Sequence, residues 1–275
     1  MNQSLMLSRS PRSCAGRNIL SKRVSTTGRL FLQIGAGAGN LDPRSQFSDG
    51  FTEFVKGMEL NVNDRLALVG PNPGNVDRLN QCWSDLESAE IVQMAVLPRG
   101  EVPREMTLWF AVEDGPHFQV ASSGHGHGHV ERLYPQGTIE SMEVPAIPID
   151  LLIDEIRRET SLELLAIDVE RMDAEILQSM NWASADFYAV SFESPHMGDG
   201  ESVVHRRLHE FGYVSAGVGL DLNGLDSLLL KTETLRRKVL ARVWELERQA
   251  NLSDVDGKPW SSLLYLINWF RTRGD

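Results

Sequence analysis

The sequence is poor in cysteine and contains no long apolar run. Only two cysteines occur in 275 residues, Cys14 in an irregular stretch and Cys82 in a predicted helix. No disulfide framework can therefore support the fold, and a reducing compartment is expected. No apolar run approaches the roughly 20 residues that span a bilayer, and no apolar signal-peptide core follows the first basic residue. We expect a soluble, cytoplasmic protein without a membrane span.

Positive charge is also scarce over the chain as a whole. The 27 Lys and Arg residues are outnumbered by 38 Asp and Glu residues, which gives a formal net charge of -11. This balance disfavours nonspecific binding to nucleic acid or to anionic membranes, because a phosphate partner normally requires a basic face. With 41% hydrophobic and 24% charged residues, the composition is that of an ordinary globular domain.

Acidic residues are absent from the first 41 positions, where basic residues stand among serines instead. The basic residues are Arg9, Arg12, Arg17, Lys22, Arg23 and Arg29. Such a composition is typical of a disordered basic tail, and it is also that of an organelle transit peptide. Both interpretations stay open for residues 1–28.

Strands and helices alternate along residues 29–231. The clearest strand is Arg29–Ile34, a continuous apolar run that suits a strand buried on both faces of a parallel sheet. Further strands are predicted at Leu66–Val69, Ile91–Val96, Met106–Val112, Leu162–Ile167 and Phe187–Phe192. Helices are predicted at 47–55, 76–83, 151–158, 172–180 and 203–211. Between them, residues 114–137 are predicted to form a long loop rich in Gly, His and Ser.

The predicted sheet closes with a hairpin. Tyr213–Val218 and Leu225–Leu230 flank Asn223-Gly224, a dipeptide typical of a tight hairpin turn. The pattern predicts an α/β Rossmann-like domain over residues 29–231, with a mostly parallel sheet, an antiparallel C-terminal edge and helices on both faces. Residues 232–275 are predicted to form a helical appendage, and the oligomeric state is left open.

The strongest functional signal is the turn that follows the first strand. Gly35, Gly37 and Gly39 are spaced two apart directly after Ile34. Glycines in such a turn let the backbone approach a ligand closely. The fingerprint of dinucleotide-binding sites needs a further glycine at position 40, which is Asn40, and an acidic residue about 20 positions on. Neither requirement is met, so a dinucleotide site is not expected.

Several short motifs occur in the order found in one family. They are the glycine turn, Val69-Gly70-Pro71-Asn72-Pro73-Gly74-Asn75, Glu113-Asp114-Gly115-Pro116-His117-Phe118, residues 129–135, Ile167-Asp168-Val169-Glu170, Phe192-Glu193-Ser194-Pro195-His196 and Gly212-Tyr213. The ordered set resembles the FkbM-like methyltransferases over about residues 30–230. The resemblance implies the class I methyltransferase fold and transfer of a methyl group from S-adenosylmethionine, typically to a hydroxyl of a sugar or other secondary metabolite. It also implies that the glycine turn wraps the amino-acid portion of this donor.

Three positions depart from the pattern that the resemblance implies. Gly70 stands where the family has an acidic residue that holds the ribose of the donor, and a lost hydrogen bond to such a charged group lowers affinity about 10- to 100-fold. Gln33 stands where an acid is common, and Arg171 replaces a glycine. Asn72 is the remaining candidate for the ribose. A degenerate family member with a binding or scaffold role is therefore an alternative.

The residues expected to carry the chemistry follow the later strands. Methyl transfer to oxygen requires the donor and the acceptor oxygen in line, and a base if the hydroxyl must lose its proton. Asp168 and Glu170 follow one strand, and Glu193 and His196 follow the next. We predict Asp168, Glu193 and His196 as catalytic residues, with His196 as the preferred base. Gly35, Gly37, Gly39, Asn72 and Asp168 are the predicted donor-binding residues.

A histidine tract offers one further alternative. His117 and the alternating Gly-His segment with His125, His127 and His129 could bind a transition metal. A flexible Gly-His loop lacks the fixed geometry of a built site, because ordering the loop costs conformational entropy. Adventitious affinity is therefore favoured over a metal-dependent enzyme, and no metal site is predicted.

Overall fold

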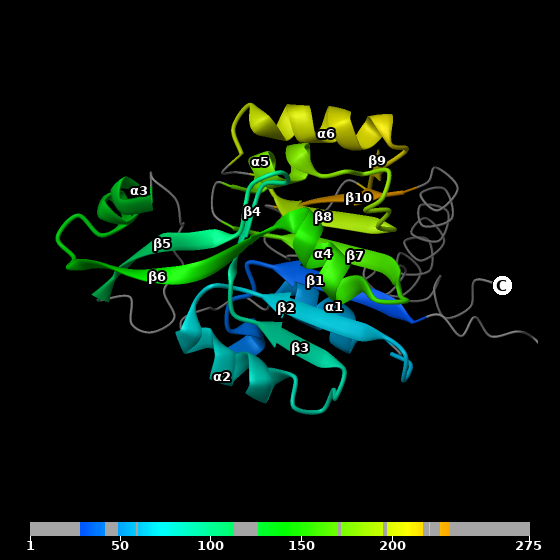
Figure 1. Cartoon of the computed structure of the whole chain (residues 1–275), viewed down its shortest axis with the longest axis horizontal. Helices are drawn as coiled ribbons and strands as arrows, with labels where there is room; N and C mark the ends of the chain where they lie inside the picture. The colour runs from blue at the N-terminus through cyan, green and yellow to red at the C-terminus, as the bar shows by residue number, and fades with distance from the viewer. Residues whose placement is uncertain are drawn as a thin grey trace, which may run out of the picture.

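A seven-stranded sheet forms the centre of the molecule (Figure 1). The computed structural model describes residues 28–41, 49–58, 60–112, 126–169, 172–194, 197–216, 220 and 226–231. In the sheet order β3-β2-β1-β7-β8-β10-β9, the strands are β3 (Ala89–Val92), β2 (Arg65–Val69), β1 (Arg29–Ile34), β7 (Ser161–Ile167), β8 (Ala189–Glu193), β10 (Asp226–Leu230) and β9 (Val214–Ser215). The first five are parallel, and β10 runs antiparallel to both of its neighbours. The predicted parallel sheet with an antiparallel C-terminal edge is confirmed.

Helices cover both faces of this sheet. They are α1 (Gly50–Lys56), α2 (Pro73–Cys82), α4 (Ile149–Arg157), α5 (Asp173–Ser179) and α6 (Gly200–Glu210). Apolar side chains of α4, α5 and α6 share one buried cluster with Leu30, Leu32 and Ile34 of β1. Those of α1 and α2 share the other cluster with Phe31. Because successive side chains of a strand point to opposite faces, the unbroken apolar run of β1 serves both clusters.

A second, three-stranded sheet was not predicted. It consists of β4 (Ala95–Leu97), β6 (Ile139–Pro148) and β5 (Arg104–Ala111), in that order. The prediction of a single strand over Ile91–Val96 was wrong, because the chain leaves the large sheet at Val92 and enters the small one at Ala95. Strands β5 and β6 pair antiparallel over their length and extend as a ribbon beside the large sheet (Figure 1).

A helix interrupts the segment that was predicted to be one long loop. Helix α3 spans Gly126–Leu133 and lies at the outer end of the β5–β6 ribbon (Figure 1). The alternating glycines hide it in the sequence, since glycine is a poor helix former. Val130 is fully buried, so tertiary packing offsets that low propensity.

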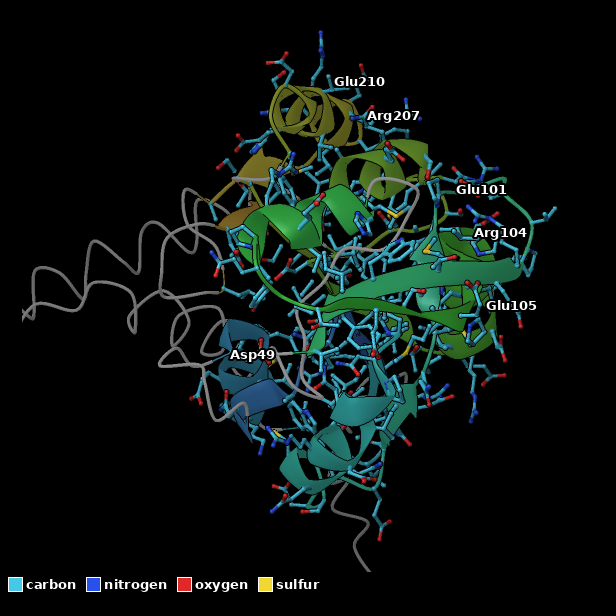
Figure 2. All side chains as sticks on the ribbon, turned by 90° about the vertical axis from the view of Figure 1, so that its left-hand side faces the viewer. Asp49, Glu101, Arg104, Glu105, Arg207 and Glu210 are labelled. Atoms are coloured by element: carbon cyan, nitrogen blue, oxygen red, sulfur yellow. The ribbon has the colours of Figure 1, made fainter. Side chains whose placement is uncertain are left out.

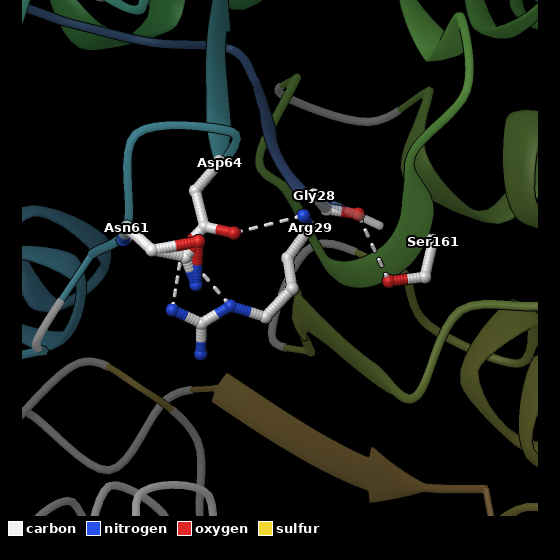
Figure 3. Close-up of polar contacts among 5 residues, drawn as sticks. All are labelled: Gly28, Arg29, Asn61, Asp64 and Ser161. Carbon is white, nitrogen blue, oxygen red and sulfur yellow. Dashed lines mark hydrogen bonds and ion pairs between the residues drawn. The ribbon is translucent and has the colours of Figure 1, made fainter. Parts of the chain in front are cut away.

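An ion pair joins the start of β1 to the loop before β2 (Figure 3). Arg29 donates to Asp64 Oδ2 from Nε at 3.0 Å and from Nη2 at 2.5 Å. The backbone N–H of Arg29 donates to Oδ1 at 2.9 Å, and that of Asn61 donates to Oδ2 at 2.9 Å. Asp64 is 1% exposed, so a buried carboxylate accepts four hydrogen bonds at the amino-terminal edge of the sheet.

Several predictions concern residues outside the described ranges. These are the tail before Gly28, the histidines His117 and His125, the Asn223-Gly224 turn and the appendage 232–275. Within the part of the chain that the structure describes, no helix has the length and apolarity needed to cross a membrane.

Candidate functional site

The predicted site residues meet at the carboxyl edge of the large sheet. Strand register places Val69, Ile34 and Ile167 side by side, and Ile167 lies beside Phe192. The next residues along the four strands are Gly70, Gly35, Asp168 and Glu193. Neighbouring strands lie roughly 5 Å apart. The structure therefore brings Gly35, Asp168 and Glu193 into one row, where open α/β sheets bind ligands.

Gly35 is held between two strands. The backbone N–H groups of Gly35 and Ala36 donate to the carbonyl oxygen of Val69 at 2.8 and 2.9 Å. Gly35 has φ +85°, and a Cβ on it would lie 1.6 Å from the carbonyl oxygen of Asp168. Both the backbone conformation and the space therefore require glycine.

Gly37 differs from its two neighbouring glycines in the space around it. A Cβ on Gly37 would meet no atom of the described residues within 4 Å, whereas one on Gly39 would lie 3.0 Å from Cys82 Sγ. Gly39 also has φ +57°, a conformation that favours glycine. The middle of the turn thus leaves room for a ligand to approach the backbone, and the outer glycines fix its shape.

Gly70 lies under the same turn. A Cβ at this position would stand 2.6 Å from the carbonyl oxygen of Ala36. The space that an acidic side chain at position 70 would need, next to the end of β2, is therefore occupied by the backbone of the turn.

Gln33 and Asn40 connect the turn to α1 through polar contacts. Gln33 Nε2 donates to Asp49 Oδ1 at 3.1 Å, and Asp49 Oδ2 accepts from the N–H of Thr52 at 3.1 Å. Asn40 accepts from the N–H of Asp49 at 3.0 Å and donates to Glu53. A carboxylate thus lies beside residue 33 although residue 33 itself is neutral.

Asn72 has a defined local role. It is the N-cap of α2, and its Oδ1 accepts from the N–H of Gly74 at 2.8 Å. Its side chain is buried. Capping of this kind stabilises a helix by about 1 kcal/mol, so the presence of asparagine here is explained without a ligand. Its predicted contact with the ribose stays a prediction.

The predicted catalytic residues differ in how the structure presents them. Asp168 is exposed and its N–H donates to the carbonyl oxygen of Ile34 at 2.9 Å. Glu193 is half-buried at the end of β8, opposite Asp226 of β10. His196, the preferred base, and Glu170 lie outside the described residues. The structure therefore places two of the three catalytic candidates on adjacent strands.

One polar chain near Glu193 was missed by sequence reasoning. Ser194 Oγ lies 2.8 Å from Ser227 Oγ, and His205 Nε2 lies 3.3 Å from the same Ser227 oxygen. Glu201 Oε1 is 3.8 Å from His205 Nε2. Such a chain can pass a proton from the end of β8 to a partly exposed imidazole. No sequence motif links these residues, because they come from a loop, a strand and a helix.

The histidine tract is described only in part. The imidazole of His127 packs edge-on against Trp109, with ring centroids 5.0 Å apart, and its Nδ1 lies 3.9 Å from Glu131. Among the described residues, no group of three or more His, Cys, Asp or Glu side chains is placed to hold a metal ion. The side chain of His129 belongs to the undescribed part.

The fold and this edge define the class of protein. A mostly parallel sheet of this order, with a glycine turn after β1 and carboxylates at the carboxyl ends of β7 and β8, is that of a Rossmann-like methyltransferase. The profile of the methyltransferase FkbM domain matches residues 33–214. The chain belongs to the FkbM methyltransferase family, and it is a methyltransferase. A search of the curated proteins gives no match.

Proposed function

We propose that this protein transfers the methyl group of S-adenosylmethionine to a hydroxyl of a sugar or other secondary metabolite. The observation that supports the proposal is the turn at Gly35–Gly39, which is fixed at both ends and, among the residues that the structure describes, has no atom close to Gly37 on its side-chain side. It lies within the FkbM domain. The residues present fit a ligand whose amino-acid portion must lie close to a backbone.

Several residues of this chain would bind the donor together. Bound S-adenosylmethionine supplies a methyl group on a positively charged sulfur. The backbone of Gly35, Gly37 and Gly39 would line its amino-acid portion, and Asn72 would face the ribose. Asp168, one strand further, would place a carboxylate on the same edge and favour a cationic ligand.

The acceptor would be handled at the end of β8. Its hydroxyl must lose a proton, and general bases contribute about 10²- to 10⁴-fold to such reactions. Glu193 is half-buried there, and His196 follows three residues later as the proposed base. Ser194 follows Glu193 directly, and its contact with Ser227, which in turn contacts His205, would offer the released proton a path away from the site.

Calorimetry with S-adenosylhomocysteine tests the donor site without knowledge of the acceptor. The wild-type protein is expected to bind this product, and Gly37→Leu is expected to lose binding because the new side chain enters the open space. Gly128→Leu is a matched control, since a Cβ on Gly128 also meets no atom of the described part of the chain within 4 Å. Equal affinity of Gly37→Leu and wild type would contradict the proposal.

The same titration separates the proposal from a degenerate family member. A folded wild-type protein that gives no heat at high micromolar S-adenosylhomocysteine would support a binding or scaffold role instead. Elemental analysis of tag-free protein tests the metal-dependent alternative. A stoichiometric transition metal would favour that alternative, and its absence would remove it.

A further inference from the structure

One face of the β5–β6 ribbon is buried, and the side chains of the other face are exposed or half-buried. Met106 and Leu108 of β5 and Val144 of β6 are buried in the core. The alternate residues point the other way, because side chains of a strand alternate between faces. These outer residues are Glu105, Thr107 and Trp109 of β5, paired with Pro145, Glu143 and Ser141 of β6. We call them the outer face of the ribbon.

An aromatic side chain and a polar pair lie next to each other on the outer face. Trp109 is half-buried. Two positions before it, Thr107 Oγ1 donates to Glu143 Oε1 at 2.7 Å. Two residues along a strand span roughly 7 Å, which is comparable to the width of one sugar ring. Glu143 is exposed, so its carboxylate is accessible to further donors.

Helix α3 bounds this place on one side. The segment that contains α3 leaves β5 after Ala111 and enters β6 at Ile139, so it lies beyond the Trp109 end of the ribbon. From there His127 packs against Trp109 with an interplanar angle of 89°. The indole is thereby supported from the α3 side, and the Thr107–Glu143 pair lies on its other side.

These groups suit one class of ligand. An indole attracts the partly positive C–H groups on one side of a sugar ring, through the negative charge on the faces of its π-system. A carboxylate and a hydroxyl accept and donate hydrogen bonds to ring hydroxyls, and bonds to the charged group are the stronger ones. Glu105 and Glu143 also repel acidic sugars, since both carboxylates are exposed on the same face.

The small sheet lies close to the proposed donor site. Strand β4 begins at Ala95, three residues after β3 ends at Val92 at the carboxyl edge. Figure 2 is viewed from the side toward which the ribbon projects, and it shows Glu101, Arg104 and Glu105 near the start of β5, the end beside β4, apart from Asp49 near the glycine turn. Part of a larger acceptor can therefore bind the ribbon while another part reaches the edge.

We propose that Trp109, Thr107, Glu143 and His127 form a binding site for a saccharide without an acidic group, as part of the methyl acceptor. This inference rests on the proposed function and names the chemistry of the acceptor. Trp109 supplies the platform, Glu143 binds hydroxyl or ammonium groups, and His127 orients the indole.

Binding of three monosaccharides tests the site. Saturation-transfer NMR and calorimetry with the full chain would use methyl α-D-glucopyranoside, D-glucosamine and D-glucuronic acid. We expect binding of the first two and none of the third. Trp109→Ala should weaken binding at least about 10-fold, and Trp109→Phe should retain part of it. Glu143→Gln should weaken glucosamine more than the neutral glucoside.

A control and a second ligand make the outcome decisive. Glu101→Gln changes an exposed carboxylate paired with Arg104 at 2.9 Å and should leave saccharide binding unchanged. Failure of wild type to bind either non-acidic sugar, or unchanged binding in Trp109→Ala, would overturn the inference. S-adenosylhomocysteine binding by the same samples would then show that the donor proposal survives, whereas sugar binding without donor binding would refute the donor proposal alone.

Discussion

The carbonyl oxygen of Ala36 lies 2.6 Å from the position that a Cβ of residue 70 would take. The turn after β1 rests directly on the end of β2, where Val69 accepts hydrogen bonds from Gly35 and Ala36. A side chain at residue 70 therefore requires a shift of this turn.

This relationship predicts the result of restoring the acid. Gly70→Asp should lower the melting temperature and should not raise affinity for S-adenosylhomocysteine, because the backbone of the turn must shift to admit the side chain. Calorimetry and thermal unfolding of the variant and wild type check both parts. A gain of about 10-fold in affinity would contradict this prediction, because it would mean that the turn shifts at little cost in free energy.

The Arg29–Asp64 pair predicts a large loss of stability. Asp64→Ala should lower the free energy of unfolding by about 3 kcal/mol, because the partly buried guanidinium and two backbone N–H groups lose their acceptor. Urea unfolding measures the change. Glu210→Gln is the control: it breaks an exposed pair with Arg207 at 3.5 Å (Figure 2) and should cost at most about 0.5 kcal/mol. Similar losses in both variants would contradict the assignment.

We predict that the protein loses stability at alkaline pH because of Tyr213. Burial, with a smaller contribution from the charge of Asp186, raises the pKa of Tyr213 well above its ordinary value of 10.0. The native state keeps this phenol protonated, and its hydroxyl donates to the carbonyl oxygen of Phe187 at 2.6 Å. The stabilisation is complete below the pKa of the unfolded chain and falls as pH rises above it, because the unfolded chain ionises first.

Tyr213→Phe isolates this effect. At pH near 8 the variant should be less stable by about 1 kcal/mol, because the hydrogen bond is lost. The difference from wild type should shrink as pH approaches 11, since only wild type gains an ionised phenol on unfolding. Tyr188→Phe, at a residue that is 50% exposed, controls for the general effect of removing a tyrosine hydroxyl. A constant difference across this range would refute the prediction.

We predict that substitutions at the end of β8 lower the rate of methyl transfer without changing the affinity for the donor product. Glu193→Gln and His196→Gln should lower acceptor-dependent methyl transfer from radiolabelled S-adenosylmethionine by about 10²-fold or more. Affinity for S-adenosylhomocysteine should stay close to the wild-type value, because the amide substitutions keep the volume of the side chains. If both variants lost donor affinity and kept turnover at saturating donor, neither residue would act on the acceptor.

The sequence by itself determined the local features of this protein. The apolar run Arg29–Ile34 followed by spaced glycines defined β1 and its turn, because both signals are encoded within a few neighbouring residues. The order of strands and helices gave the fold class. Helix α3 was not predicted, since glycine and histidine have low helix propensity and the packing of α3 against β5 is a tertiary contact.

Only the tertiary structure decided which residues lie close together in space. An apolar alternation predicts that Met106–Val112 is a strand, but not that it leaves the large sheet and pairs with β6. Likewise, Ser194, His205 and Ser227 become neighbours only through strand register and helix packing. Contacts between residues far apart in sequence depend on how whole helices and strands pack. A local sequence pattern does not specify which element packs against which.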